Sequence, residues 1–273
     1  MAVKFTKMQG LGNDYLYVYG PVPDQVEELC IRLSDRHFGA GSDGMIFISP
    51  SASADFAMRI FNADGSEAMM CGNGIRCVGK YVFDKGYTDK TDLRIETRSG
   101  IRHLTLFVED GAVKEAEVDM GTGVLIEPRT LSVLDHDFTC YPVSVGNPHA
   151  VIFTASEDEK EPETYVPLIE CHEAFLPDRT NVEFVRVLED GALRMRVWER
   201  GSGITMACGT GACASAFAAV KMGFCSYDTP IRVDLDGGSL LIRVQKDDRI
   251  LMRGPAAFVF EGEACDDLLS SIR

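Results

Sequence analysis

The sequence has no long apolar run. No stretch reaches the ~18 consecutive apolar residues that a membrane span requires, and residues 1–5 contain no apolar signal core. A role at or in a membrane is therefore not expected. We expect a cytoplasmic protein.

Basic charge is also scarce. The chain has 27 Lys and Arg against 42 Asp and Glu, which gives a formal net charge of -15. Such an acidic protein repels nucleic-acid backbones and anionic lipid surfaces. We therefore expect no nucleic-acid partner, and a small molecule is the expected ligand.

The nine cysteines lack the spacing of a metal site or of a disulfide framework. Zinc sites use close-set pairs such as Cys-x-x-Cys. The closest pairs here, Cys71 with Cys77 and Cys208 with Cys213, have five and four residues between them. An odd number of cysteines without a secretory signal argues against disulfides. We expect free thiols and no metal.

The composition is that of a folded globular protein. The 273 residues are 45% apolar and 25% charged, and a chain of this length can form one large or two moderate domains. Short alternating or β-branched apolar runs between turn signals predict a largely antiparallel sheet. These runs occupy residues 15–18, 45–48, 104–108, 150–153, 182–185 and 240–244.

Three segments have the pattern of helices. Val26, Leu29 and Leu33 share one face of an amphipathic helix that we expect to end near Gly39. Residues 75–83 and 212–220 are apolar or small on nearly every side. That pattern is typical of a helix buried all round.

One tetrapeptide pattern occurs twice. Cys71 and Cys208 each begin Cys-Gly-(Asn/Thr)-Gly, 137 positions apart, and residues 58–61 (MRIF) match residues 195–198 (MRVW) at the same distance. The duplication predicts an α+β fold of two pseudo-symmetric halves, each a mostly antiparallel β-barrel-like sheet wrapped around a central helix. The first half covers residues 1–117, carries Cys71 and is completed by residues 254–273. The second covers residues 118–253 and carries Cys208.

A cysteine at the start of a helix is suited to acid/base chemistry. The helix N-terminus stabilises the thiolate through its partial positive charge and its free N–H groups. The glycines let a substrate carboxylate approach the backbone N–H groups that follow. If the halves face each other, two thiols reach one carbon from opposite sides, so that one removes a proton while the other delivers one. Inversion of a stereocentre needs this arrangement.

Each cysteine also has a plainer interpretation, because cysteine is often simply buried packing. We accept that interpretation for seven of the nine. For Cys71 and Cys208 it would make the thiols incidental to a glycine-rich turn. Their equivalent places in the repeat argue against it. The seven packing cysteines are Cys30, Cys77, Cys140, Cys171, Cys213, Cys225 and Cys265.

Motifs along the whole chain resemble those of diaminopimelate epimerase. In the first half they are residues 10–14 (GLGND), 61–66 (FNADGS) and 71–77 (CGNGIRC). In the second half they are residues 146–149 (GNPH), 179–182 (RTNV), 198–201 (WERG) and 207–212 (ACGTGA). The resemblance implies two similar halves with the active site between them.

The resemblance also implies roles for individual residues. Cys71 and Cys208 are the two acid/base residues, and His149 and Glu199 adjust their protonation. No cofactor is needed, and the protein is expected to be a homodimer. The implied substrate contacts are Asn13, Asn62, Gly72, Asn73, Asn147, Asn181, Glu199, Arg200, Gly209 and Thr210.

The activity implied is the interconversion of LL-2,6-diaminopimelate and the meso form, a step in lysine and peptidoglycan precursor synthesis. A substrate with two amino-acid ends needs polar groups for the end that does not react. Arg200 suits a distal carboxylate, and asparagines can both donate and accept hydrogen bonds. Three positions differ from the family pattern: Gly44 replaces a side-chain amide, Ile204 a Glu, and Phe260 a Tyr at the dimer contact.

Three other functions fit parts of the pattern. A proline or hydroxyproline racemase of the same architecture uses two cysteines but has no need of a polar pocket for a second amino-acid end. An isomerase that uses a carboxylate instead of thiols would not need both cysteines. A protein that only binds an amino acid would not exchange its α-hydrogen with solvent.

Overall fold

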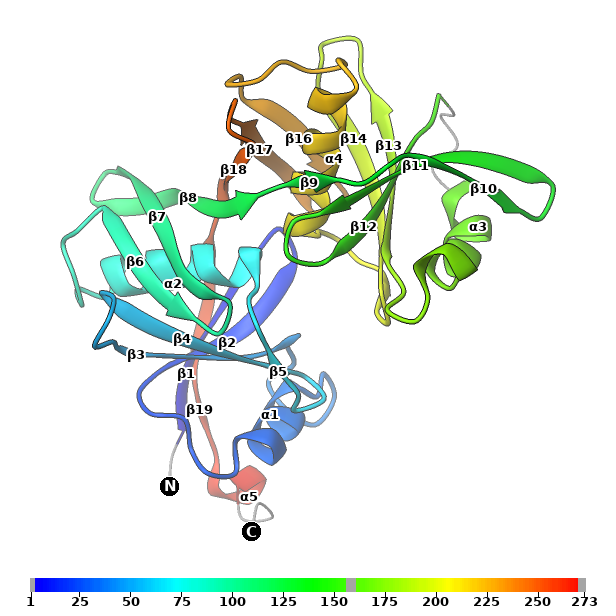
Figure 1. Cartoon of the computed structure of the whole chain (residues 1–273). Coiled ribbons are helices and arrows are strands. Elements are labelled where there is room, and N and C mark those ends of the chain that lie inside the picture. Colours follow the sequence, from blue (N-terminus) through cyan, green and yellow to red (C-terminus); the bar gives the residue numbers. More distant parts are fainter. Residues whose placement is uncertain (1–2, 156–160, 270–273) are drawn as a thin grey trace. The chain divides into compact units, whose positions relative to one another are not determined.

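The computed structural model of the chain describes residues 3–155 and 161–269 (Figure 1). The chain folds into two compact units, residues 1–118 with 254–273, and residues 119–253. The predicted boundary, between residues 117 and 118, lies one residue before this division. The assignment of the two halves as domains stays a prediction. The last residues of the predicted segment 254–273 lie outside the described part of the chain.

The first unit is a sheet with three helices. Its strands run in the order β19-β1-β2-β3-β4-β6-β7-β8, with the short β5 paired to β4. Only β2 with β3 and β4 with β6 are parallel among these described pairs. The elements are β1 (Val3–Gly10), β2 (Asn13–Tyr19), α1 (Val26–Ser34), β3 (Gly44–Pro50), β4 (Phe56–Asn62), β5 (Glu67–Ala68), α2 (Gly72–Asp84), β6 (Asp92–Thr97), β7 (Gly100–Glu109), β8 (Ala112–Thr122), β19 (Ala257–Ala264) and α5 (Asp266–Leu269).

The second unit repeats this plan. Its strands run in the order β10-β11-β12-β13-β14-β16-β17-β18, with β9 also on β11 and β15 on β14. The parallel pairs again come at equivalent places, β12 with β13 and β14 with β16. The elements are β9 (Val124–Leu125), β10 (Arg129–Val133), β11 (His136–Ser144), β12 (Pro148–Phe153), α3 (Glu161–Glu170), the 3-10 turn η1 (Glu173–Phe175), β13 (Asn181–Val187), β14 (Leu193–Glu199), β15 (Gly203–Ile204), α4 (Gly209–Lys221), β16 (Ile231–Leu235), β17 (Gly238–Val244) and β18 (Arg249–Pro255).

Each sheet packs on one central helix, as the apolar segments predicted. The helix α2 is buried from Gly72 to Val82 and packs on β1, β2 and β7. At Gly79 an added Cβ would lie 2.7 Å from the side chain of Leu106, so the strand approaches the helix closely there. The alanine-rich α4 allows a similar approach by β11 to β14, β16 and β17.

The predicted fold class is confirmed, with one refinement. The sheets are open rather than closed barrels, because no pairing joins β8 to β19 or β10 to β18 in the described parts of the chain. None of the described helices is long and apolar enough to cross a membrane.

Two details of the helices differ from the predictions. The amphipathic helix α1 ends at Ser34 rather than near Gly39, because the Asp35 carboxylate accepts the amide N–H groups of His37 and Phe38 and turns the chain. The helix α3 was not predicted. It contains Pro167 and has little amphipathic pattern, so the sequence carries no clear helix signal there.

Candidate active site

Cys71 is the N-cap of α2. Its backbone is extended, and its Sγ accepts the N–H of Gly74 at 3.3 Å. The thiol also donates to Oδ1 of Asn13 at 3.4 Å. A Cβ at position 74 would lie 2.7 Å from Cδ1 of Ile46 and 3.5 Å from Sγ. The second glycine of the motif therefore leaves room for the Ile46 side chain at the helix start.

Cys208 is the N-cap of α4 in the same geometry. Its Sγ accepts the N–H of Gly211 at 3.3 Å and lies 3.5 Å from Oγ1 of Thr210. A Cβ at position 211 would lie 2.9 Å from Oε1 of Glu183 and 3.3 Å from Sγ. Ile46 and Glu183 are also 137 positions apart. The Ile46 methyl near Cys71 in the first unit is therefore replaced by the Glu183 carboxylate near Cys208 in the second.

The surroundings of Cys208 favour the protonated thiol. Burial raises its pKa well above the usual range, and the negative charges of Glu199 and Glu183 raise it further. The hydrogen bonds from Thr210 and from the amide of Gly211 oppose this shift but are outweighed. A helix start alone therefore does not make Cys208 a thiolate.

The neighbours of Cys71 are neutral. Burial raises the pKa of Tyr15 well above the usual range, and the adjacent Cys71 raises it further, so the phenol stays protonated. Asn13 is held by Asp43, whose Oδ2 accepts from Nδ2 at 2.8 Å. Asp43 in turn pairs with Arg36 at 2.8 Å. The charged Asp43 therefore contacts Asn13, whereas the carboxylates of Glu199 and Glu183 act on Cys208 itself.

Three other predicted contacts lie in the first unit. Asn62, at the end of β4, donates from Nδ2 to Oγ of Ser66 at 3.1 Å. Gly72 and Asn73 form the first turn of α2 and are buried. The backbone N–H groups of these two residues lie at the end of the helix where a carboxylate binds most favourably.

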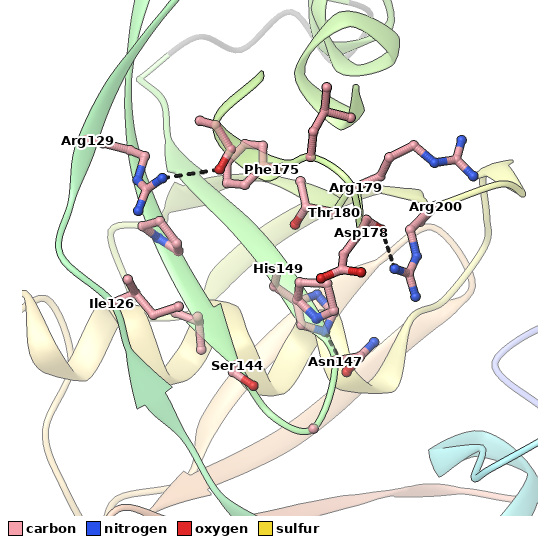
Figure 2. A pocket seen from close by; sticks show the side chains of 16 residues that line it. Ile126, Arg129, Ser144, Asn147, His149, Phe175, Asp178, Arg179, Thr180 and Arg200 are labelled. Atoms are coloured by element: carbon pink, nitrogen blue, oxygen red, sulfur yellow. Dashed lines mark hydrogen bonds between the residues drawn. The ribbon is translucent and has the colours of Figure 1, made fainter. Parts of the chain in front are cut away.

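In the second unit the predicted residues Asn147 and His149 are hydrogen-bonded to each other and line a cavity of about 450 Å³. Asn147 directly precedes β12, His149 lies in that strand, and Arg200, which follows β14, lines the same cavity (Figure 2). Nε2 of His149 lies 3.1 Å from Oδ1 of Asn147, and Nδ2 of Asn147 donates to Oγ1 of Thr210 at 3.3 Å. This series of hydrogen bonds extends through Thr210 to Cys208.

The remaining predicted residues of this unit are close by. Oδ1 of Asn181 accepts the backbone N–H of Arg200 at 2.8 Å. The guanidinium of Arg200 donates to the carbonyl of Asp178 at the cavity wall (Figure 2). Glu199 accepts from Oγ1 of Thr205 at 2.5 Å. Gly209 begins α4 and is buried.

Sequence reasoning missed Glu183. Its Oε1 lies 2.6 Å from Nδ1 of His149, and its side chain is 0% exposed. It belongs to the apolar run that predicted β13, and an acidic residue inside such a run is the signal that was available. In the described residues no group of three or more His, Cys, Asp or Glu side chains could hold a metal ion.

The structure explains why Gly44 carries no side-chain amide. A Cβ there would lie 2.1 Å from the carbonyl oxygen of Phe61, and φ is +153°. No larger residue fits without moving the strand. Asn181, 137 positions later, supplies an amide at the equivalent place of the second unit.

Comparisons with known proteins agree on one family. The family model described as diaminopimelate epimerase matches residues 5–126 and 141–259. The diaminopimelate epimerase of Methanococcus maripaludis is 49% identical over 96% of this chain and 99% of its own. That of Phocaeicola vulgatus is 50% identical over 96% of this chain and 98% of its own.

Solved structures share the fold at much lower identity. A hydroxyproline epimerase from Agrobacterium vitis, with bound trans-4-hydroxy-L-proline, has a TM-score of 0.74 at 16% identity and covers 99% of this chain and 98% of its own. A probable proline racemase from Agrobacterium radiobacter has a TM-score of 0.78 at 16% identity over 96% of this chain and 93% of its own. At this identity the likeness concerns the fold alone.

Proposed function

The chain belongs to the diaminopimelate epimerase family, and on that basis we propose that it interconverts LL-2,6-diaminopimelate and meso-2,6-diaminopimelate without a cofactor. The observation that carries the proposal is the pair of cysteine N-caps, Cys71 and Cys208, at equivalent positions of two equivalent units. Each supplies a thiol beside a helix start that can hold a carboxylate.

In the proposed reaction the two thiols work on opposite faces of one α-carbon. Cys71 as thiolate takes the α-proton of the LL form, so that the C–H bond breaks, an S–H bond forms and the electron pair moves towards the carboxylate. Cys208 as thiol delivers its proton to the other face and becomes the thiolate. The raised pKa of Cys208 supports its role as the acid in this direction. Exchange with solvent then restores the starting protonation states.

The carboxylate next to the reacting carbon is proposed to bind between the helix starts. Backbone N–H groups of Gly72 and Asn73 face it from one helix, and those of Gly209 and Thr210 from the other. Such preorganised donors stabilise the negative charge that develops on deprotonation.

The far end of diaminopimelate carries a second ammonium and a second carboxylate. Arg200 lies at the cavity of the second unit and is proposed to bind that carboxylate. Asn147 lines the same cavity, and Asn181 holds the backbone of Arg200. With Asn13, Asn62 and Glu199 these groups are the proposed contacts to the far end and to the α-ammonium.

We further propose a homodimer in the cytoplasm, acting in lysine and peptidoglycan precursor synthesis. The edge strand β19 supports a dimer, because the consecutive side chains Phe258, Val259 and Phe260 are 37%, 53% and 44% exposed. Sedimentation should give twice the chain mass for the wild type, and Phe260→Asp should shift it towards the monomer. A monomeric wild type would contradict this part of the proposal.

The function is tested by incubating the purified protein in deuterium oxide with LL-diaminopimelate and, separately, with L-proline. Deuterium at the α-carbon and formation of the meso isomer are expected with diaminopimelate alone. Deuterium in proline alone would assign a proline racemase instead. Binding of diaminopimelate without any exchange would assign a protein that only binds the amino acid.

A further inference from the structure

Glu183 is an unusual residue for the interior of a sheet. It lies in β13 with its side chain fully buried, and its strand neighbours Val182 and Phe184 are apolar and buried. Its Oε2 has no hydrogen-bond partner among the described residues. Burying a carboxylate costs several kcal/mol unless it is paired, so a fully buried and only half-satisfied one indicates a function.

The partner of Glu183 is His149. Nδ1 of the ring lies 2.6 Å from Oε1 of Glu183, and Nε2 lies 3.1 Å from Oδ1 of Asn147. Nδ2 of the same amide donates a hydrogen bond to Oγ1 of Thr210. The ring is thus held at both nitrogens, by a carboxylate oxygen at Nδ1 and by an amide oxygen at Nε2.

This pair continues as a chain of hydrogen bonds to the reacting thiol. The ring of His149 orients the amide of Asn147, the amide donates to Oγ1 of Thr210, and that oxygen lies 3.5 Å from Sγ of Cys208. Every link is in the second unit. The inner end of this series of hydrogen bonds is Glu183, whose side chain is fully buried in the neighbouring strand β13.

We propose that Glu183 is a positioning residue that holds His149 and, through it, Asn147 against the start of α4. This inference rests on the proposed epimerase function. Glu183 fixes the ring at Nδ1, so Nε2–H always points at the same amide oxygen. The amide in turn keeps Thr210 at the helix start where the carboxylate of the substrate is proposed to bind.

Among the described residues of the first unit this pair has no counterpart. Ile46 occupies the place of Glu183, and Asp43 binds the amide of Asn13 directly. A general need for a buried carboxylate at this point of the fold is therefore excluded, because the first unit forms the same helix start with an aliphatic side chain. The carboxylate is specific to the half that carries Cys208.

A double-mutant cycle tests the inference. Glu183→Gln in the full-length enzyme should lower kcat/KM for LL-diaminopimelate by about 10- to 100-fold, because residues in one hydrogen-bond network are energetically coupled. In the His149→Gln background the same substitution should lower kcat/KM by less than about twofold, because the contact from Glu183 through His149 to Asn147 is already lost. Equal factors in both backgrounds would overturn the inference, as would a Glu183→Gln enzyme within twofold of the wild type.

Glu170→Gln is the matched control. Glu170 is also a buried glutamate of the second unit, bonded to Trp198 and Arg179 and not to His149. Its effect should multiply with that of His149→Gln rather than disappear. If Glu183→Gln does not fold, as judged by circular dichroism, Glu183→Asp takes its place in the cycle with the same criterion.

A second readout does not depend on turnover. The pH dependence of iodoacetamide alkylation, followed at each cysteine by mass spectrometry, should move to lower pH for Cys208 in Glu183→Gln, because one nearby carboxylate is lost while Glu199 stays. The profile of Cys71 should not move. An unchanged Cys208 profile would overturn the link to this thiol. A wild type without α-hydrogen exchange would instead refute the proposed function.

Discussion

The two units build the same cysteine N-cap from the same strands but hold it differently. Beside Cys71 lie an isoleucine methyl, a neutral phenol and an asparagine that is fixed by an ion-paired aspartate near the surface. Beside Cys208 lie two carboxylates, one of them fully buried on a histidine. The repeat supplies two thiols at equivalent helix starts, and the carboxylates found only in the second unit raise the pKa of Cys208.

This difference has a chemical consequence. A two-base epimerase needs one thiolate and one thiol at the start of each turnover, and two thiols in identical surroundings would share the single charge equally. The negative neighbours of Cys208 favour its protonated form. We therefore expect a resting enzyme that is prepared for the LL substrate.

The largest expected effect tests whether both thiols are needed despite this difference. Cys71→Ala and Cys208→Ala should each lower kcat by at least ~10³-fold, because neither proton transfer can be made from the other side of the carbon. Turnover of LL-diaminopimelate is the measurement, with circular dichroism as the check on folding. If either variant retained more than a tenth of the wild-type kcat, the claim that both thiols are needed would be wrong.

The second prediction concerns the equivalent positions Gly44 and Asn181. Gly44→Ala should lower the free energy of unfolding by about 3 kcal/mol, because its Cβ would meet the carbonyl of Phe61. Asn181→Ala should cost only about 1 kcal/mol, the value of one hydrogen bond to the backbone of Arg200. Urea unfolding measures both, and equal losses would contradict the difference seen between the units.

The third prediction is a loss of stability at high pH. Burial raises the pKa of Cys77 in the first unit to about 11 and that of Cys140 in the second unit to about 12. The folded state keeps protons that the unfolded state loses above its ordinary thiol pKa. The stability is therefore complete below that pKa and falls as the pH rises, by about 1.4 kcal/mol per unit for each thiol.

Urea unfolding between about pH 9 and pH 10.5 checks this slope. Cys77→Ala and Cys140→Ala should each flatten it by about 2 kcal/mol over that range. The flattening should extend to higher pH for Cys140→Ala. A slope that neither variant changes would show that other groups set the alkaline stability.

The smallest effect concerns the aspartate that holds Asn13. Asp43→Asn should lower kcat/KM by about tenfold, since the amide of Asn13 loses a charged acceptor and orients less well at Cys71. Asp84→Asn is the control, because this partly buried carboxylate pairs with Lys80 at the far end of α2. An equal loss in both variants would mean that the Asp43 effect is structural.

The sequence was sufficient for the parts of the fold that repeat. Motifs at a fixed spacing and apolar runs around them predicted the two buried helices, the two cysteine N-caps and the strands β2, β3, β7, β12, β13 and β17. The helix α3 was missed because Pro167 and its weak amphipathic pattern hide it. Only the structure showed that the two sheets are open, because the pairing of distant strands leaves no local signal.

The candidate site was predicted less completely. Asn147 and His149 were proposed from the family resemblance, but the link from His149 to Glu183 depends on the register of the parallel strands β12 and β13. A set of motifs does not contain that register. The raised pKa of Cys208 was likewise missed, because burial and two carboxylates outweigh the helix start that the sequence alone suggested.

The most direct test follows hydrogen during the first few per cent of turnover. Wild-type enzyme is incubated with unlabelled LL-diaminopimelate in deuterium oxide, and both isomers are analysed by mass spectrometry. We expect one deuterium in the newly formed meso product and none in the remaining LL substrate, since one thiol removes hydrogen and the other supplies solvent deuterium. Meso product that retains the original hydrogen would show a single base and contradict the two-thiol mechanism.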